Sequence, residues 1–284
     1  MKAKISFLFI AGVLLLLTPP SLVHGKRDPK DLVLYIPFDE GRGKTAADIS
    51  KFENHGKLEG NWKWDDGKFG KALRFAINDP GIVRTATDDV FAFEGGDEIT
   101  IMAWVSMDVA RPGARGILYN SPNGIKANYA IRLETVDPSF FYRDKGDLDF
   151  HRVTGIWDSV PIDTWTHIAA TNTFGNPDAM KIYLNGKDQK SSRDGGVNKG
   201  HEAKDWSKGD GSKPPLPANG PITIGGYGAF GEPFQGAIDE VMIWKVAFTE
   251  EDIQEIMLAP GTDFLGVEPH RKLTTKWGAI KQNP

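Results

Sequence analysis

Short apolar runs separated by turn-forming residues recur along most of the chain, and this pattern restricts the fold most. Eleven runs qualify as strands, because they are rich in Ile, Val, Thr and aromatic residues and are bounded by Gly, Asn, Asp or Pro. They cover residues 32–38, 72–76, 98–107, 116–120, 129–133, 140–143, 151–157, 166–173, 180–184, 221–224 and 237–244. One helix is predicted, which Thr249 can cap and Pro260 ends. Its shared apolar face comprises Ile253, Ile256 and Met257.

The run at 98–107 has the composition of a central strand. Bulky side chains occupy both alternating sets of positions in residues 99–105, as in a strand that is covered on each side. We therefore expect Trp104, and with it Trp165, to lie in the core and not to serve as sugar platforms. Asn185 and Gly186 follow another apolar run and tolerate the positive φ angles of a tight hairpin turn.

Length and composition are those of one packed domain with an insertion. The chain has 284 residues, of which 40% are hydrophobic and 25% charged, close to the averages for soluble proteins. We expect the domain to span residues 32–260. A Gly-rich segment without strand or helix signals, residues 186–220, predicts an inserted surface loop. Residues 261–284 form a C-terminal tail.

The first 25 residues have the features of a secretory signal peptide. Lys2 and Lys4 precede an apolar run over residues 5–17, and small or neutral residues follow up to Gly25. The run is shorter than the roughly 20 residues that cross a bilayer, so an uncleaved anchor is the weaker alternative. We expect the mature chain to begin close to Lys26, to be secreted to the periplasm or the extracellular space, and to lack a membrane span.

Charge and cysteine content exclude several functions. Lys and Arg number 34 and Asp and Glu 38, a net charge of -4, and no long basic run is present, so we expect no nucleic-acid partner. The chain has 0 Cys, which excludes disulfides, thiol nucleophiles and thiolate metal sites. Stability outside the cell must therefore come from the core and from any bound metal.

Six segments, taken in order, resemble the LamG-like jelly roll of the concanavalin A-like lectin and glucanase superfamily. They are residues 34–41 (LYIPFDEG), 67–75 (GKFGKALRF), 99–105 (ITIMAWV), 165–169 (WTHIA), 182–186 (IYLNG) and 234–241 (FQGAIDEV). Each motif is weak alone, but their common order is hard to obtain by chance. The resemblance implies an all-β, two-sheet antiparallel jelly-roll sandwich. The long loop after Gly186 departs from the short hairpin of the family.

Catalytic signatures are missing from the sequence. Glucanases of this superfamily resemble one another in a Glu-x-Asp-x-x-Glu or Glu-x-Asp-x-Glu run, which puts alternate acids on one strand face. The nearest acidic clusters, residues 94–98 and 239–240, lack that spacing. Nucleophile-elbow, phosphate-loop and zincin motifs are also absent. We therefore expect no enzyme activity, and a glycoside hydrolase of the same superfamily is the alternative.

The resemblance also implies a structural calcium that joins the first strand to the last. Matched to this chain, Asp239 would be the carboxylate ligand, with Asp39 and carbonyls from Asn54 to Gly56 completing the site, and Asp48 a second candidate. Strict alternation along 234–241 would put Asp239 on the face of Ala237 and Val241, and Glu240 on the other face. The alternative is that Asp39, Asp48 and Asp239 bind local backbone amides.

The leading hypothesis is a secreted, non-catalytic module that binds a glycan or a protein at an extracellular surface. A purely structural or adhesive envelope protein is a further alternative. Aromatic side chains outside the core pattern can stack on sugar rings, and each is also a candidate for ordinary packing. The candidate ligand-binding residues are Tyr142, Trp157, Trp206 and Tyr227.

Overall fold

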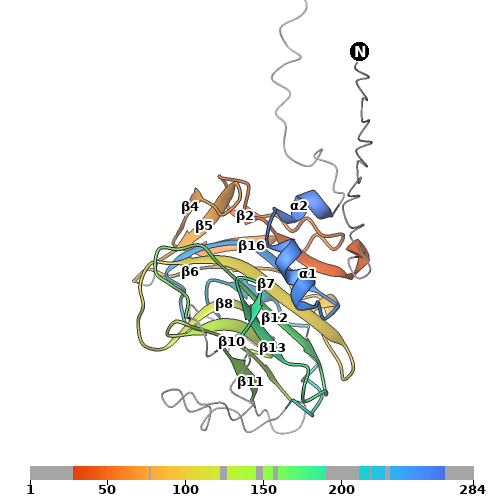
Figure 1. Ribbon diagram of the computed structural model, residues 1–284. Coiled ribbons are helices and arrows are strands. Elements are labelled where there is room, and N and C mark those ends of the chain that lie inside the picture. Colours follow the sequence, from red (N-terminus) through yellow and green to blue (C-terminus); the bar gives the residue numbers. More distant parts are fainter. Residues whose placement is uncertain are drawn as a thin grey trace, which may run out of the picture.

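Two antiparallel sheets pack face to face (Figure 1). The computed structural model describes residues 28–76, 78–121, 127–144, 150–155, 159–189, 211–217, 219–227 and 231–265. The expected signal peptide, most of the 186–220 insertion and the tail beyond residue 265 lie outside these ranges. Each sheet has eight strands. The predicted jelly-roll sandwich is therefore confirmed.

The first sheet has the order β14-β13-β12-β7-β16-β5-β4, and β1 also pairs with β16. Its strands are β1 (Leu32–Ile36), β4 (Trp62–Asp66), β5 (Lys71–Phe75), β7 (Glu98–Met107), β12 (Thr166–Thr173), β13 (Lys181–Leu184), β14 (Lys187–Asp188) and β16 (Gly236–Trp244). The predicted hairpin turn joins β13 to β14, with φ of 49° at Asn185 and 75° at Gly186.

The second sheet has the order β11-β10-β9-β8-β15-β6-β3-β2. Its strands are β2 (Thr45–Ala46), β3 (Gly56–Gly60), β6 (Gly81–Arg84), β8 (Ala114–Asn120), β9 (Tyr129–Glu134), β10 (Asp137–Arg143), β11 (Phe150–Thr154) and β15 (Ile222–Ile224). Strands β8 to β11 follow one another along the chain as a meander. Side chains from these consecutive strands therefore lie next to one another on each face of the sheet.

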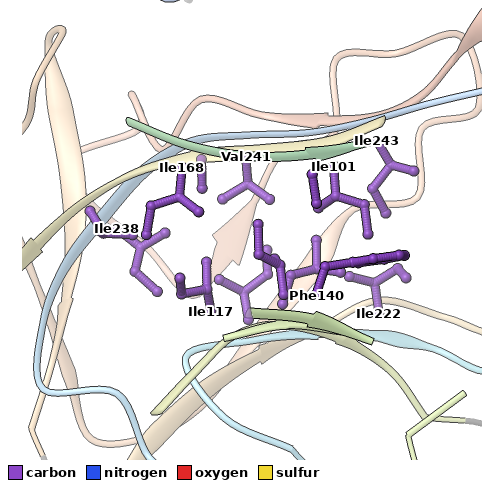
Figure 2. Close-up of a cluster of buried hydrophobic side chains, with 14 of the residues drawn as sticks. Ile101, Ile117, Phe140, Ile168, Ile222, Ile238, Val241 and Ile243 are labelled. Carbon is purple, nitrogen blue, oxygen red and sulfur yellow. The ribbon is translucent and has the colours of Figure 1, made fainter. Parts of the chain in front are cut away.

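The core lies between the sheets and consists of one side-chain set from each strand. Figure 2 shows Ile101, Ile168 and Ile243 of the first sheet facing Phe140 and Ile222 of the second. In β7 the odd-numbered residues from 99 to 107 all join this core, while Met102 belongs to a separate cluster on the outer face. Both faces of β7 are therefore covered, as the sequence predicted. Trp104 is 5% exposed and buried, whereas Trp165 is only half-buried.

Two helices follow the last strand, α1 (Glu250–Ile256) and α2 (Gly261–Phe264), and two 3-10 turns, η1 (Pro29–Asp31) and η2 (Asp89–Phe91), occur earlier. The hydroxyl of Thr249 accepts from the backbone N–H of Asp252, and the Asp252 carboxylate accepts from the Thr249 N–H. This reciprocal capping confirms the predicted start of the helix. Ile253 and Ile256 are buried, as expected from their spacing.

Several strands carry no clear sequence signal. In β4 the residues are half-buried or exposed, because this strand lies at the edge of the first sheet. β3 begins and ends with Gly and alternates charged with apolar side chains over only five residues. Short polar edge strands bury few apolar side chains, so the apolar-run criterion overlooks them.

Candidate ligand-binding face and acidic site

The outer faces of the two sheets differ. On the first sheet, α1 and the following segment cover an apolar cluster whose members include Tyr35, Met242, Trp244, Ile253 and Ile256. Figure 1 shows both α-helices beside the strands of this sheet. Burial of these side chains stabilises the helix, which at seven residues is too short to be stable alone. Because the helices occupy this face, a ligand site is expected on the outer face of the second sheet.

The outer face of β8, β9 and β10 carries a cluster of aromatic rings. Tyr119, Ala130 and Phe141 pack together with Ala127, and the half-buried Tyr227 lies against them. The ring centroids of Tyr119 and Tyr227 are 5.2 Å apart, and those of Tyr119 and Phe141 6.3 Å. Tyr227 is therefore the ring of this cluster that offers surface to a ligand.

A network of ion pairs adjoins these rings. The guanidinium of Arg132 donates to Glu232 Oε2 at 3.0 Å and to Glu134 Oε1 at 2.8 Å. Arg152 donates to the same Glu134 oxygen at 2.9 Å, and the Tyr119 hydroxyl donates to Glu232. The Arg132 guanidinium carbon also lies 4.8 Å from the Phe141 ring centre. We call the rings and charges together the Tyr119–Arg132 face: Tyr119, Arg132, Glu134, Phe141, Arg152, Tyr227 and Glu232.

Burial and charge shape the electrostatics of the Tyr119–Arg132 face. Side-chain exposure is 11% for Arg132 and 28% for Glu232, so their interaction is little screened by water. Burial, followed by the Glu232 carboxylate, raises the pKa of Tyr119. Burial alone would lower the pKa of Arg132, but Tyr119, Glu134 and Glu232 outweigh it and raise that pKa. The network is therefore a fixed array of hydrogen-bonding groups.

The structure places the predicted ligand-binding aromatic residues in different environments. Tyr227 belongs to the Tyr119–Arg132 face. The prediction of an exposed ring at Tyr142 is wrong, because this side chain is 0% exposed in the core and its hydroxyl donates to the carbonyls of Gly211 and Lys213. Trp157 and Trp206 lie outside the described residues. Sequence reasoning missed Arg132, although its charge at an outward position of an apolar strand was a usable signal.

A β-bulge in β16 changes the predicted placement of the two adjacent acids. The register shifts between Asp239 and Met242, and Glu240 has a φ of 53°. Val241 consequently joins the inner core, and Glu240 accepts from the Tyr35 hydroxyl at 2.7 Å on the outer side. The prediction from strict alternation, with Asp239 beside Val241 and Glu240 on the opposite face, is therefore wrong.

Asp239 is a buried carboxyl group beneath a turn at residues 67–70. It is 0% exposed, Oδ2 accepts from the Phe69 N–H at 3.0 Å, and Oδ1 accepts from the Glu240 N–H at 2.8 Å. Burial is the largest cause that raises the pKa of Asp239 to about 8. Burial likewise raises the pKa of Glu240 to about 7. Two neighbouring acids thus resist ionisation.

Asp39 reaches the other end of the same turn. Its Oδ1 accepts from the Lys71 N–H at 3.0 Å, and a Cβ added at Gly70 would lie 2.0 Å from that oxygen. A Cβ at Gly67 would lie 2.7 Å from Asp239 Oδ2. The two glycines therefore allow the backbone to approach both carboxylates closely. Asp39 and Asp239 are brought together across one turn, each binding a backbone amide.

The remaining predicted metal ligands form a different arrangement. Asp48 is 1% exposed and accepts from the Tyr35, Ser50 and Asn54 N–H groups and from the Ser50 hydroxyl. The Asn54 amide donates to Asp88 at 3.0 Å. Gly56 pairs with Ala46, and a Cβ there would lie 2.2 Å from Val83. Asp48 thus binds local backbone amides, which was the alternative to a role as metal ligand. Among the described residues, it shares no hydrogen-bond partner with Asp239.

The donor set around the 67–70 turn is incomplete for calcium. Within the described ranges, no group of three or more His, Asp or Glu side chains is arranged as a metal site. Calcium takes six to eight oxygens, including carbonyls and water, so Asp39 and Asp239 would supply only part of the shell. In the described part of the chain, neither carboxylate forms an ion pair with a basic side chain. Asp39 and Asp239 would therefore supply at most two carboxylates to a cation, and the described residues form no complete calcium site.

Two antiparallel sheets that pack face to face, with helices over one outer face, define a jelly-roll sandwich. The family model of the concanavalin A-like lectin/glucanases superfamily matches residues 82–254. The chain belongs to this superfamily. None of the curated proteins matches the sequence significantly. No helix in the described ranges is long and apolar enough to cross a bilayer.

Several solved structures share the fold. The binding domain of paraclostridial mosquitocidal protein 1 has 16% identity and a TM-score of 0.60, and the alignment covers 80% of this chain and 52% of that domain. Domain 4 of the Geobacillus stearothermophilus arabinanase AbnA, solved with arabinotriose, has 18% identity, a TM-score of 0.54 and coverages of 79% and 97%. The botulinum neurotoxin serotype G binding domain has 13% identity, a TM-score of 0.56 and coverages of 79% and 50%. The chain spans about half the length of these toxin domains.

Proposed function

We propose that this protein is a non-catalytic module that binds a glycan on the Tyr119–Arg132 face. The observation that carries the proposal is the contrast between the sheets: helices cover one outer face, and the other combines a half-buried tyrosine with fixed arginine and glutamate side chains. Sugars present apolar ring faces and hydroxyl groups, which match aromatic rings and polar side chains respectively. The arabinotriose complex of the AbnA domain supports a saccharide ligand by analogy of fold.

The arrangement of acids favours binding over hydrolysis. Glycoside hydrolysis needs two carboxyl groups in different environments, one acid and one base or nucleophile. Glu134 and Glu232 are both held by Arg132, so they share one kind of environment. Asp239 has a raised pKa but is 0% exposed beneath the 67–70 turn, where no substrate reaches it. Release of reducing sugars by the wild-type protein would favour the hydrolase alternative.

The setting that we propose for this module is outside the cell. The amino-terminal signal pattern, which lies outside the described residues, supports export. N-terminal sequencing of exported protein tests this, and an intact Met1 on membrane-held protein would contradict cleavage. The proposed partner is a glycan, and the same binding site would serve a free and a surface-attached one.

Loss of the Tyr227 ring should weaken glycan binding by about two- to tenfold, because a stacked aromatic contributes about 0.5–1.5 kcal/mol. A glycan array that includes arabino-oligosaccharides identifies the probe, and calorimetric titration compares Tyr227→Ala with the wild type. Trp62→Ala is the matched control, since Trp62 is also a half-buried ring but lies on β4 of the first sheet. Equal loss in both variants, or none in Tyr227→Ala, would exclude this face as the site.

We also propose that a calcium ion held by Asp39 and Asp239 stabilises the module. Saturating calcium should raise the melting temperature of chelated protein by about 5 °C or more, because binding only to the folded state contributes about 2.7 kcal/mol at a hundredfold excess over Kd. Asp239→Asn should remove most of this rise. Asp66→Asn is the control, because Asp66 is exposed and pairs with Lys71 beside the same turn. Superimposable melting curves with chelator and calcium would contradict the site.

A further inference from the structure

Strand β4 forms an edge of the first sheet that has no neighbour on one side within the described part of the chain. It is the last strand in the order of that sheet, and it pairs there only with β5. Figure 1 shows β4 at the margin of the molecule. All five of its residues pair with β5 without a register shift, so the edge is regular. Such an edge presents backbone N–H and C=O groups to which another strand can bind.

The backbone groups of Trp62 and Trp64 point to this free edge. The Gly67 N–H donates to the Gly70 carbonyl at 3.1 Å, which makes these two glycines a hydrogen-bonded pair at the end of the β4–β5 hairpin. Hydrogen-bonded and non-hydrogen-bonded pairs alternate along an antiparallel ladder. Counting back from Gly67, residues 65 and 63 bond to β5, and the tryptophans between and before them face the opposite way.

The outer face of this edge carries side chains of both charges. Lys63 Nζ lies 3.7 Å from Asp65 Oδ2, and 67% and 30% of the two side chains are exposed. On the inner face, Trp62 and Trp64 are half-buried against the core. A lysine in the middle of an edge strand normally discourages pairing with another strand. An added strand must therefore place a carboxylate opposite Lys63.

A second copy of β4 supplies that carboxylate in one register. In a two-fold symmetric antiparallel pair, facing residues point to the same side of the sheet, so the axis passes between two identical residues. An axis at Lys63 or at Asp65 places like charges opposite each other, which is destabilising. An axis at either end of β4 leaves most of the strand unpaired. An axis at Trp64 places Lys63 of each copy opposite Asp65 of the other.

We propose that two copies of this chain associate through β4, in antiparallel register about Trp64, and so join their first sheets into one. The two Trp64 residues exchange backbone hydrogen bonds, because their N–H and C=O groups face the free edge. Lys63 and Asp65 occupy the neighbouring non-hydrogen-bonded pairs, where facing side chains are closest. The same charges that oppose the two shifted registers therefore stabilise this one.

The contact is small, so the dimer should be weak and reversible. Five residues from each copy are far fewer than the roughly 20–30 of a standard interface. The Asp66 N–H, which donates to the Asp65 carboxylate at 2.9 Å, must also exchange this acceptor for the Trp62 carbonyl of the second copy. We expect a dissociation constant in the micromolar range or higher, and weaker association at high salt, which screens exposed ion pairs.

The symmetry of this dimer has a consequence for ligand binding, which rests on the proposed function. A two-fold axis perpendicular to the joined sheet places both second sheets, and so both Tyr119–Arg132 faces, on the same side. Two sites on one side bind a surface-attached glycan with avidity. Lys63→Glu should therefore weaken binding to an immobilised glycan and leave binding of the free glycan unchanged. An equal loss for both would contradict this consequence.

Sedimentation velocity of the mature protein, from micromolar to millimolar concentration, measures the association itself. Lys63→Glu should weaken it at least tenfold, because both facing charge pairs become repulsive. Lys187→Glu is the matched control and should behave as the wild type. Lys187 is also an exposed lysine on an edge strand of the first sheet, but it lies on β14 at the opposite edge.

Single cysteines test the register, because the chain has 0 Cys of its own. An equimolar mixture of Lys63→Cys and Asp65→Cys should give mainly the mixed disulfide dimer under mild oxidation. The Cα atoms of non-hydrogen-bonded facing residues are about 4.5 Å apart, within the range that a disulfide spans. The unchanged Asp65 of one variant and Lys63 of the other still attract each other in the mixed dimer.

Three results would overturn the proposal, and none of them depends on glycan binding. The first is a wild-type protein that stays monomeric at millimolar concentration. The second is equal dimerisation of the wild type, Lys63→Glu and Lys187→Glu, which would place the interface on another surface. The third is a disulfide dimer of one variant with itself as the main product of the mixture, which would place the axis at that residue and contradict the register about Trp64.

Discussion

Without calcium, the free energy of unfolding should fall by about 4 kcal/mol or more between pH 5 and pH 8, because Asp239 keeps its proton in the folded state over most of this range. The pKa of Asp239 is about 8 when folded, against an ordinary value of 3.8 for an aspartate. A one-proton difference between the folded and unfolded states changes stability by about 1.4 kcal/mol per pH unit. The contribution is fully present below the unfolded pKa and is lost as the pH rises through the folded value.

Urea unfolding at several pH values in chelator measures this slope. Glu240, with a folded pKa of about 7, should add to the slope below pH 7. Asp239→Asn should flatten the profile whatever its absolute stability, and the exposed Glu94→Gln should leave it unchanged. A calcium ion would compete with the proton, so saturating calcium should stabilise the protein more at pH 8 than at pH 5. A flat wild-type profile in chelator would show that Asp239 is ionised throughout.

Asp48→Ala should destabilise the fold by about 3–5 kcal/mol, the range for breaking a buried hydrogen-bond network that includes a charged group. The substitution leaves the N–H groups of Tyr35, Ser50 and Asn54 without their acceptor. These amides tie β1 to the segment that precedes β3. Urea unfolding in chelator at pH 7 gives the change in unfolding free energy.

Asp39→Ala is the control for Asp48→Ala. Asp39 is exposed and accepts one backbone hydrogen bond, from Lys71, so its loss should cost about 1 kcal/mol or less. Both aspartates were candidate metal ligands in the sequence, Asp39 in the leading set and Asp48 as a second candidate. This pair of variants distinguishes an anchoring carboxylate from one that is available to a cation. Similar costs for both substitutions would contradict the anchoring role of Asp48.

The fold was predictable because its determinants are local and repeated. The alternation in β7 and the caps of α1 are fixed within about ten residues, and the Asn185–Gly186 turn needs only its own two positive φ angles. Tyr142 shows the limit of this reasoning. A tyrosine at an inward position is indistinguishable from an outward one until the register of β10 against β9 is known.

The site depends on contacts between distant parts of the chain. Arg132 and Glu232 are one hundred residues apart, and Asp239 meets Phe69 across 170 residues, so no spacing rule anticipates either contact. The bulge at Glu240 is equally hidden, because one extra residue in a ladder leaves the apolar pattern of β16 almost unchanged. Only the family resemblance, which rests on the order of the six segments, predicted that Asp39 and Asp239 lie close together.

The pairing of β1 with β16 determines how this module can be joined to anything else. Leu32 lies opposite Trp244, and the Lys245 N–H donates to the Asp31 carbonyl at 2.8 Å, so the chain enters and leaves the sandwich side by side. The strands through which the chain enters and leaves, β1 and β16, belong to the first sheet, whereas the Tyr119–Arg132 face belongs to the second. A tether at either end therefore attaches to the back of the sandwich and leaves the opposite side turned toward its surroundings.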